Sequence, residues 1–377
     1  MNSSTKDRRT GKKLRVVVKI GSGIVTGQNG DAGGQQLSKI AGEIAAFVGA
    51  GNDVIIVSSG AIAIGSIKLG LKKRPVDLPA KQAAAAIGQV GLMNRWEQMF
   101  SEYGIPVAQI LLTKNDFHDR ERYLNARNTL LKLISMGAIP VINENDTVAT
   151  EEINFGDNDT LSAVVSSKVD ADALVIITDV DGLYDGDPRI DSGAKLITEV
   201  KKITESITKL ASGSAGCELS IGGMTSKLEA AKIATASGVA TYIVNGRKNV
   251  GLFDIISGRV RCTKFVPDEK MDGRKRWIAF GARVSGKIFV DDGAARAITS
   301  SSKSLLPAGI TAVKGNFSKG DVVSVVHSDR EIARGLVFYS SQDMKTIKGH
   351  KSSDIEKLLC RKDYEEAIHK DNLVLLG

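Results

Sequence analysis

The first stretch of this chain, about 260 residues long, alternates short apolar runs rich in Val and Ile with longer amphipathic segments. The runs predict buried strands at 15–20, 54–57, 106–112, 138–142, 173–178 and 240–244. The segments between them have helical periodicity and predict helices at 35–49, 79–103, 120–136, 160–169 and 225–237. Because strands that alternate with helices form βαβ units, the pattern predicts an α/β fold with a mostly parallel central sheet covered on both faces.

After about residue 258 the pattern changes to short strand-like pieces separated by Gly, Asp and Ser turns, at 286–290, 309–314, 321–326 and 332–338. This change predicts a small, mainly β domain. The charges divide in the same way, because residues 21–258 hold 22 basic and 27 acidic groups whereas residues 259–377 hold 22 and 15. We therefore expect a basic N-terminal extension at 1–13, an α/β domain at 14–262, a linker at 263–276 and a β domain at 277–377.

The composition indicates in which cellular compartment the protein works and which kinds of site it is expected to lack. The 377 residues are 42% hydrophobic and 25% charged, as in globular proteins with a large core. No apolar run approaches the roughly 18 residues of a membrane-spanning helix, and the polar, basic start has no apolar stretch like that of a secretory signal. Three scattered cysteines and four histidines favour neither a disulfide framework nor a zinc site. We expect a cytoplasmic protein with no membrane partner and no protein-bound metal.

Ligands of open parallel sheets bind at the carboxyl ends of strands, so polar residues directly after the predicted strands are candidate site residues. Lys19 lies at the end of the first strand, before Gly21-Ser22-Gly23. This segment is neither a Walker A loop nor a complete dinucleotide fingerprint, since Thr26 replaces the third glycine. Ser58-Ser59-Gly60 ends the second strand and opens a helix, where an anion site and an ordinary N-cap are equally consistent with the sequence.

The densest group of polar residues is Asn143-Glu144-Asn145-Asp146 after the fourth strand and Gly156-Asp157-Asn158-Asp159 before a helix. An EF-hand is excluded because Leu161 occupies the position of the third ligand and no Glu closes the loop. Turn and cap chemistry explains some of these residues, but not so many polar groups beside two buried elements. The pattern therefore favours a functional site here.

Two further segments complete the candidate site. Thr178-Asp179 follows the fifth strand, and residues 221–227 contain a Gly-Gly pair and enter a helix with Lys227 one turn in. A glycine loop at a helix N-terminus suits nucleotide phosphates, although a flexible linker with a surface lysine gives the same pattern. Two lysines, glycine-rich backbone and a group of acids and amides at one sheet edge together predict phosphoryl transfer, which needs cations on the migrating group and polar groups on the acceptor.

At these residues the chain resembles the amino acid kinase family, from Leu14 nearly to the C-terminus. The most specific match is VINENDTVA at 141–149 followed by GDNDTLS at 156–162. Shorter matches lie at 18–21, 58–63, 119–122, 125–127, 178–179, 182–184, 187–189 and 222–227. Segments 306–310 and 320–323 resemble a PUA domain. The resemblance implies a three-layer α/β/α amino acid kinase fold followed by a small, mainly β, PUA-like domain.

The resemblance also implies an activity, namely ATP-dependent phosphorylation of the γ-carboxylate of L-glutamate to L-glutamyl 5-phosphate, the first step of proline biosynthesis. Its catalytic residues would be Lys19 and Lys227 on the migrating phosphoryl group and Asp159 to orient them. Ser59, Asp146 and Asn158 would hold glutamate. Mg²⁺ would bridge the ATP phosphates without a protein ligand that the sequence identifies. The ATP contacts would be Lys19, Thr178, Asp179, Ile221, Gly222, Gly223, Met224, Thr225, Ser226 and Lys227.

Regulation and assembly follow from the same resemblance. It implies inhibition by proline in competition with glutamate, with Asp116 and Glu152 as regulatory residues, and a homo-oligomer, either dimer or tetramer. The chain departs from the family at Ile221, where a Thr or Ser usually precedes the Gly-Gly pair, so a contact there would use the backbone. The family's Gly-Thr-Ser after the first lysine is Gly21-Ser22-Gly23 in this chain.

Two alternatives remain open at the level of sequence. One is a sibling kinase that acts on acetylglutamate, aspartate or a nucleoside monophosphate, against which the 141–162 block argues. The other is an RNA-binding protein whose kinase body is vestigial. The presence of Lys19, Asp159 and Lys227 argues against a vestigial body, whereas the basic balance of residues 259–377 leaves RNA binding open.

Overall fold

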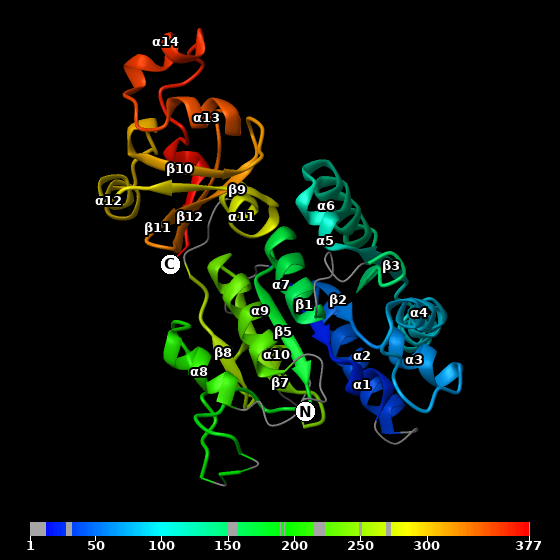
Figure 1. The fold of residues 1–377 in the computed structure, drawn as a ribbon. Coiled ribbons are helices and arrows are strands. Elements are labelled where there is room, and N and C mark those ends of the chain that lie inside the picture. The colour runs from blue at the N-terminus through cyan, green and yellow to red at the C-terminus, as the bar shows by residue number, and fades with distance from the viewer. Residues whose placement is uncertain are drawn as a thin grey trace. The chain divides into compact units, whose positions relative to one another are not determined.

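The chain divides into two compact units, which are described separately below. The first contains Met1–Asp116 and Leu124–Lys270, and the second contains Phe117–Tyr123 and Met271–Gly377. Figure 1 draws the first unit mainly in blue to green and the second in yellow to red. The computed structural model describes residues 13–27, 32–149, 157–188, 190–191, 193–213, 223–248, 251–268 and 273–376.

The first unit is built on a mixed but mostly parallel sheet. Its strands are β1 (Arg15–Ile20), β2 (Asp53–Ser58), β3 (Val107–Leu112), β4 (Ile139–Glu144), β5 (Ala173–Thr178), β6 (Glu199–Val200), β7 (Ala240–Asn245) and β8 (Thr263–Phe265). In the described residues these eight strands lie in the order β3-β4-β2-β1-β5-β7-β8-β6. Neighbouring strands are parallel except β7 and β8, which are antiparallel. The predicted parallel sheet is confirmed.

Helices cover both faces of this sheet (Figure 1). On one face, Val16, Val18 and Ile56 of the central strands pack with Leu37 and Ile44 of α2 in one core. On the other face, α7 contacts β1 and β5, and α9 contacts α7 and β7. This arrangement confirms the three-layer α/β/α fold. The helices are α1 (Ser22–Thr26), α2 (Ala32–Gly49), α3 (Ala61–Lys68), α4 (Leu78–Ser101), α5 (Lys114–His118), α6 (Arg120–Ser135), α7 (Asn158–Lys168), α8 (Glu205–Gly213), α9 (Met224–Ala236) and α10 (Leu252–Ile256).

The alternation of side chains along β1 decides where its lysine points. Val16 and Val18 belong to the core that includes α2. Because successive side chains of a strand point to opposite faces, Val17 and Lys19 point to the face covered by α7 and α9. Lys19 is therefore carried to the carboxyl edge of the sheet on the side of these two helices.

Part of the range predicted as a linker, 263–276, forms regular structure. Thr263–Phe265 is β8, which pairs with β7 through Thr241↔Phe265 and with β6 through Val200↔Phe265. Thr263 and Phe265 are fully buried. β8 is only three residues long, which is too short for a strand to be predicted from its apolar pattern. It is a strand because it pairs with β6 and β7.

The second unit is mainly β, as predicted. Its sheet has the order β10-β9-β11-β12-β13, with β9 and β11 parallel and the other neighbours antiparallel. Ile288, Val323 and Val325 of the sheet share a core with Ile298 and Met344 of the helices that cover it. The elements are α11 (Gly273–Arg276), η1 (Trp277–Gly281), β9 (Val284–Val290), α12 (Asp292–Ser301), η2 (Pro307–Gly309), β10 (Ile310–Gly315), β11 (Val322–His327), β12 (Arg330–Leu336), α13 (Ser341–Ile347), η3 (Ser352–Asp354), α14 (Ile355–Leu359), η4 (Lys370–Asn372) and β13 (Leu373–Leu375).

Helix length and polarity also decide whether a segment could span a membrane. Within the described ranges, no helix combines the length and the apolar composition that crossing a bilayer requires.

Candidate active site

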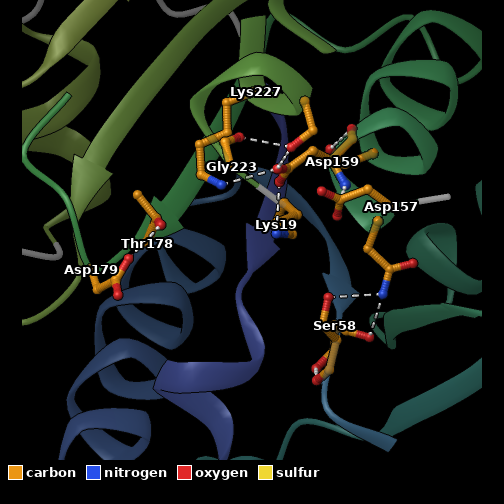
Figure 2. Close-up of polar contacts among 12 residues, drawn as sticks. Lys19, Ser58, Asp157, Asp159, Thr178, Asp179, Gly223 and Lys227 are labelled. Carbon is orange, nitrogen blue, oxygen red and sulfur yellow. Dashed lines mark hydrogen bonds and ion pairs between the residues drawn. The ribbon is translucent and has the colours of Figure 1, made fainter. Parts of the chain in front are cut away.

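The carboxyl edge of the large sheet gathers most of the residues that the sequence singled out. β1, β2, β4, β5 and β7 all end at this edge, and α7 and α9 begin beside it. Figure 2 shows Lys19 and Lys227 turned toward Asp159, with Thr178 and Asp179 on one side of them and Ser58 on the other. The edge therefore has a central charged group and two flanks.

The central group is an ion-paired triad of Lys19, Asp159 and Lys227. The Lys19 ammonium lies 2.6 Å from Asp159 Oδ1, and the Lys227 ammonium lies 3.2 Å from Asp159 Oδ2. The three side chains are 5%, 6% and 0% exposed for Lys19, Lys227 and Asp159 respectively. Asp159 is in the first turn of α7 because the Asp157 side chain caps that helix and accepts the Asp159 N–H at 3.1 Å. The structure thus brings together the three residues predicted to be catalytic.

The triad has a net positive charge. Burial alone would raise the pKa of Asp159, but the adjacent ammonium groups of Lys19 and Lys227 outweigh burial and lower this pKa below its ordinary value. The carboxylate therefore stays ionised and holds both lysines in place. Each ammonium has three N–H donors, more than its contact with a single Asp159 oxygen requires. A buried pair of cations with one anion between them is arranged to receive a further negative group such as a phosphoryl oxygen.

The start of α9 places Lys227 and its neighbours. Gly223 precedes the helix, and Lys227 lies in its first turn. The Ser226 hydroxyl lies 3.0 Å from Asp159 Oδ2, so this residue, predicted as an ATP contact, also supports the triad. Met224 is half-buried and Thr225 is exposed. Ile221 and Gly222 lie outside the described residues.

One flank is a chain of neutral hydrogen-bonding groups. The Asn158 amide donates to Ser59 Oγ at 2.9 Å and to Asn143 Oδ1 at 2.9 Å. The Asn143 amide donates in turn to Gln89 Oε1 at 2.9 Å. Within the described residues, Asn158 Oδ1 is a buried acceptor without a hydrogen-bond donor. The structure therefore joins two of the predicted acceptor-side residues and leaves an oxygen that can accept from a ligand.

Local backbone geometry presents Ser59 at this flank. Gly60, which precedes α3, has φ of +116°, a left-handed conformation that residues with a side chain rarely adopt. A Cβ at this position would lie 3.3 Å from Val25 Cγ1. The Trp96 indole N–H donates to Ser58 Oγ at 3.0 Å and fixes the end of β2 from α4. The second strand therefore turns sharply after Ser59 and enters α3.

Asp146 has a different environment from Asp159. Burial raises its pKa to about 6, and Arg74 lowers the pKa only in part. A partly buried carboxylate with an elevated pKa is a candidate binding group for a cation, because a cationic ligand would offset the cost of its ionisation, which Arg74 offsets only in part.

The other flank follows β5. Thr178 is buried and its hydroxyl donates to Asp179 Oδ1 at 3.2 Å, whereas the Asp179 side chain is exposed. Asn245, at the end of β7, donates to the Asp179 carbonyl oxygen at 3.2 Å. The two residues predicted as ATP contacts thus lie on a loop that β7 supports.

Of the two predicted regulatory residues, Asp116 lies among the described residues and Glu152 does not. Asp116 Oδ2 accepts the backbone N–H and the hydroxyl of Thr113, both at 2.7 Å, near the start of α5. Glu152 lies outside the described residues.

Several residues of this edge were not expected from the sequence. Gln89 on α4 accepts from the Asn143 amide but was not expected at the site, and Asn143 was singled out only as part of the polar group after the fourth strand, without a role of its own. Asn245 directly follows the apolar run at 240–244, so the rule of polar residues after strands could have found it. Gln89 gave no such signal, because it lies inside the long helix α4 and does not follow a strand.

The fold and this edge define a phosphotransferase architecture, and the chain belongs to the amino acid kinase family, whose sequence model matches residues 14–245. A PUA domain matches residues 286–359. The chain is 49% identical over 365 residues to "Glutamate 5-kinase" of Thermoanaerobacter sp. (strain X514), covering 96% of this chain and 98% of the relative. It is 48% identical over 367 residues to "Glutamate 5-kinase" of Geobacter sulfurreducens (strain ATCC 51573 / DSM 12127 / PCA), covering 97% and 98%.

A solved structure supports the fold. "Carbamate kinase from Giardia lamblia bound to AMP-PNP" matches with a TM-score of 0.50 at 16% sequence identity, covering 68% of this chain and 99% of that chain. At this identity the likeness concerns the fold alone.

Proposed function

We propose that this protein transfers the γ-phosphoryl group of ATP to the γ-carboxylate of L-glutamate, giving L-glutamyl 5-phosphate and ADP. The observation that carries the proposal is the buried Lys19–Asp159–Lys227 triad beside the Asn158–Ser59 pair. The names of relatives at about 49% identity over nearly the whole chain support it. They favour neither a vestigial kinase body that binds RNA nor a sibling kinase.

The proposed role of the triad is to stabilise charge during transfer. Negative charge is spread over the phosphoryl oxygens in the transition state, where the ammonium groups of Lys19 and Lys227 offset it. Asp159 fixes the positions of both lysines before the reaction, so no reorganisation is needed at that moment. The acceptor is itself a carboxylate with an ordinary pKa of about 4.3, so it is ionised at neutral pH and needs no general base.

The two flanks would bind the two substrates. On one flank, Ser59 and Asn158 would hold glutamate, and Asp146 would pair with its α-ammonium group. On the other flank, Thr178, Asp179 and the segment 221–227 would contact ATP. Asn158 Oδ1, which accepts from no donor in the described part of the chain, supports the first assignment, and the position of Gly223 at the start of α9 supports the second.

Mg²⁺ would enter with ATP and neutralise part of the phosphate charge. Magnesium in kinase sites is held largely by substrate phosphates and water, with one or two carboxylates. In the parts of the chain that the structure describes, no group of three or more His, Cys, Asp or Glu side chains is arranged to hold a metal. We propose no direct protein ligand for it.

Proline inhibition belongs to the same proposal. Proline shares an α-carboxylate and a cationic amine with glutamate, so it would occupy Ser59 and Asp146 without offering a γ-carboxylate. We expect inhibition competitive with glutamate, weakened by Asp116→Asn or Glu152→Gln while kcat stays largely intact. Initial rates against glutamate at several proline concentrations test this. Inhibition that excess glutamate does not relieve would contradict a shared pocket.

The setting of the reaction is part of the proposal as well. We propose a cytoplasmic enzyme that assembles as a dimer or tetramer. Sedimentation velocity of the full chain over a concentration range tests the assembly, and a single monomeric species at all concentrations would contradict it.

The decisive experiment is ATP turnover with and without L-glutamate, using hydroxylamine to trap the acyl phosphate as a hydroxamate. We expect hydroxamate with glutamate and not with acetylglutamate or aspartate, and we expect no ADP release with UMP, whose phosphorylation would form no acyl phosphate to trap. Failure to form glutamate-dependent hydroxamate would overturn the proposed reaction, and stronger turnover with another acceptor would identify a sibling kinase.

A further inference from the structure

The loop that follows β5 is held from β7 by one buried amide. Thr178 and Asn245 are register partners and end their strands side by side. The Asn245 amide nitrogen donates to the Asp179 carbonyl oxygen at 3.2 Å and to Asp181 Oδ1 at 2.8 Å. Asn245 Oδ1 accepts the Arg247 N–H at 2.9 Å, and Asn245 is only 8% exposed. Both ends of this side chain are therefore committed to the two loops.

Asp181 is the second member of this group. Its Oδ2 accepts from the Lys248 ammonium at 2.8 Å and from the Tyr184 hydroxyl at 3.1 Å. Its side chain is 12% exposed, whereas that of Lys248 is 69% exposed. Asp181 thus ties the β5 loop to the loop after β7 through charged and neutral hydrogen bonds.

These contacts fix the backbone that carries the proposed nucleotide contacts. The Gly246 N–H donates to the Thr178 carbonyl at 2.8 Å, and the Thr178 hydroxyl donates to Asp179 (Figure 2). The Asn245 amide holds the next carbonyl along the chain. Consecutive peptide groups of this loop are therefore set from β7 rather than by the loop itself.

We propose that Asn245 is a positioning residue for the nucleotide, which acts through the Thr178–Asp179 loop and with Asp181 as its partner. The inference rests on the proposed function, because it takes this loop as the ATP side of the site. Loss of the amide would leave the Asp179 carbonyl and one oxygen of Asp181 without their donor, and the loop would sample other conformations before binding. Nucleotide affinity should fall while glutamate affinity, which depends on the opposite flank, should not.

The test measures nucleotide binding directly, by calorimetric titration of the full-length protein with ADP in the absence of any acceptor. We expect Asn245→Ala to weaken ADP binding about tenfold. Asn245→Asp keeps the size of the side chain but faces the Asp181 carboxylate, so we expect a loss at least as large. Lys248→Met removes only the exposed partner of Asp181, and we expect a loss of about threefold. Asn128→Ala, at an exposed position on α6, is the matched control and should bind ADP like the unmodified protein.

Thermal unfolding and the KM for glutamate separate positioning from a structural role. The inference requires KM for glutamate to stay within twofold in variants that unfold as single species. ADP affinity within twofold of the unmodified protein in both Asn245 variants would overturn it, and so would a parallel loss of ADP and glutamate affinity. An unmodified protein that binds ADP but forms no hydroxamate would refute the proposed reaction while leaving the role of Asn245 intact.

Discussion

The triad and the acceptor-side flank lie on the same sheet edge but solve the problem of buried polar groups in opposite ways. At the triad, a fully buried carboxylate is paired with two buried lysines, and their charges lower the pKa of Asp159. At the flank, neutral amides form the chain Gln89–Asn143–Asn158, and burial raises the pKa of Asp146 to about 6. At the triad the counter-charges outweigh burial, whereas at Asp146 the charge of Arg74 offsets burial only in part.

Removal of either lysine should have the largest effect. Lys19→Ala and Lys227→Ala should each lower kcat by roughly 10²-fold or more, because each removes a preorganised charge that acts most strongly in the transition state. KM for glutamate should change much less. Steady-state kinetics test this, with Lys232→Ala, an exposed lysine on the same helix as Lys227, as the matched control. Near-normal kcat in either variant would make that lysine a structural residue only.

The same substitution should have opposite effects on stability in the two regions. Asp159→Asn leaves two buried ammonium groups without their carboxylate and should lower the free energy of unfolding by about 3 kcal/mol at pH 7. Asp146→Asn removes a carboxylate that burial disfavours, so it should raise the free energy of unfolding on the order of 1 kcal/mol at pH 7. Urea unfolding of both variants tests the contrast.

The pH dependence should have opposite signs for the same reason. The folded-state pKa of Asp159 is lowered, so its stabilising contribution is present above the ordinary Asp pKa and is lost as pH falls through the folded value. The folded-state pKa of Asp146 is raised, so its ionisation costs stability as pH rises from about 4 to 6. Equal shifts of stability in both variants at pH 7 would remove the contrast between the two regions.

The affinity for glutamate should depend on the negative charge of Asp146. Asp146→Asn should raise KM for glutamate and leave KM for ATP nearly unchanged. In the unmodified protein, KM for glutamate should rise as pH falls through about 6, by about tenfold at pH 5, because the protonated carboxyl no longer attracts an ammonium group. The Asn variant should lack this rise. Equal damage to both Michaelis constants would show that Asp146 holds the loop together instead.

The smallest effect is expected from the hydrogen-bonded chain behind Asn158. Gln89→Leu removes the acceptor of the Asn143 amide, so Asn158 should lose part of its orientation and KM for glutamate should rise about threefold, with kcat within twofold. Gln109 is exposed, and its Oε1 accepts from the Gln89 amide at 3.0 Å; Gln109→Leu leaves the Gln89 oxygen that holds Asn143 in place, so it is the control and should change neither constant. A large fall in kcat in Gln89→Leu would show that this flank affects the phosphoryl-transfer step as well as glutamate binding.

Much of the architecture could be predicted because its signals are local. The Val- and Ile-rich runs mark β1, β2, β4, β5 and β7 within a residue or two, and the rule of polar residues after strands found Lys19, Ser59 and Thr178. The three-residue β8 and the support of Asn143 by Gln89 could not be predicted in this way. Both depend on pairing between segments far apart in the chain, for which neither periodicity nor turn chemistry gives a signal.

The sequence by itself determined which residues reach the carboxyl edge, because strand periodicity sets the face on which Lys19 lies and cap residues set where α7 begins. Tertiary structure decided which of them touch. Asp159 and Lys227 are 68 residues apart and meet only because α7 and α9 pack together on one face of the sheet. The same packing brings the ammonium groups of Lys19 and Lys227 against Asp159, and their charges outweigh burial and lower its pKa. Hydrogen bonds and ion pairs depend on distances of a few ångströms, which close packing of distant segments fixes and local sequence does not.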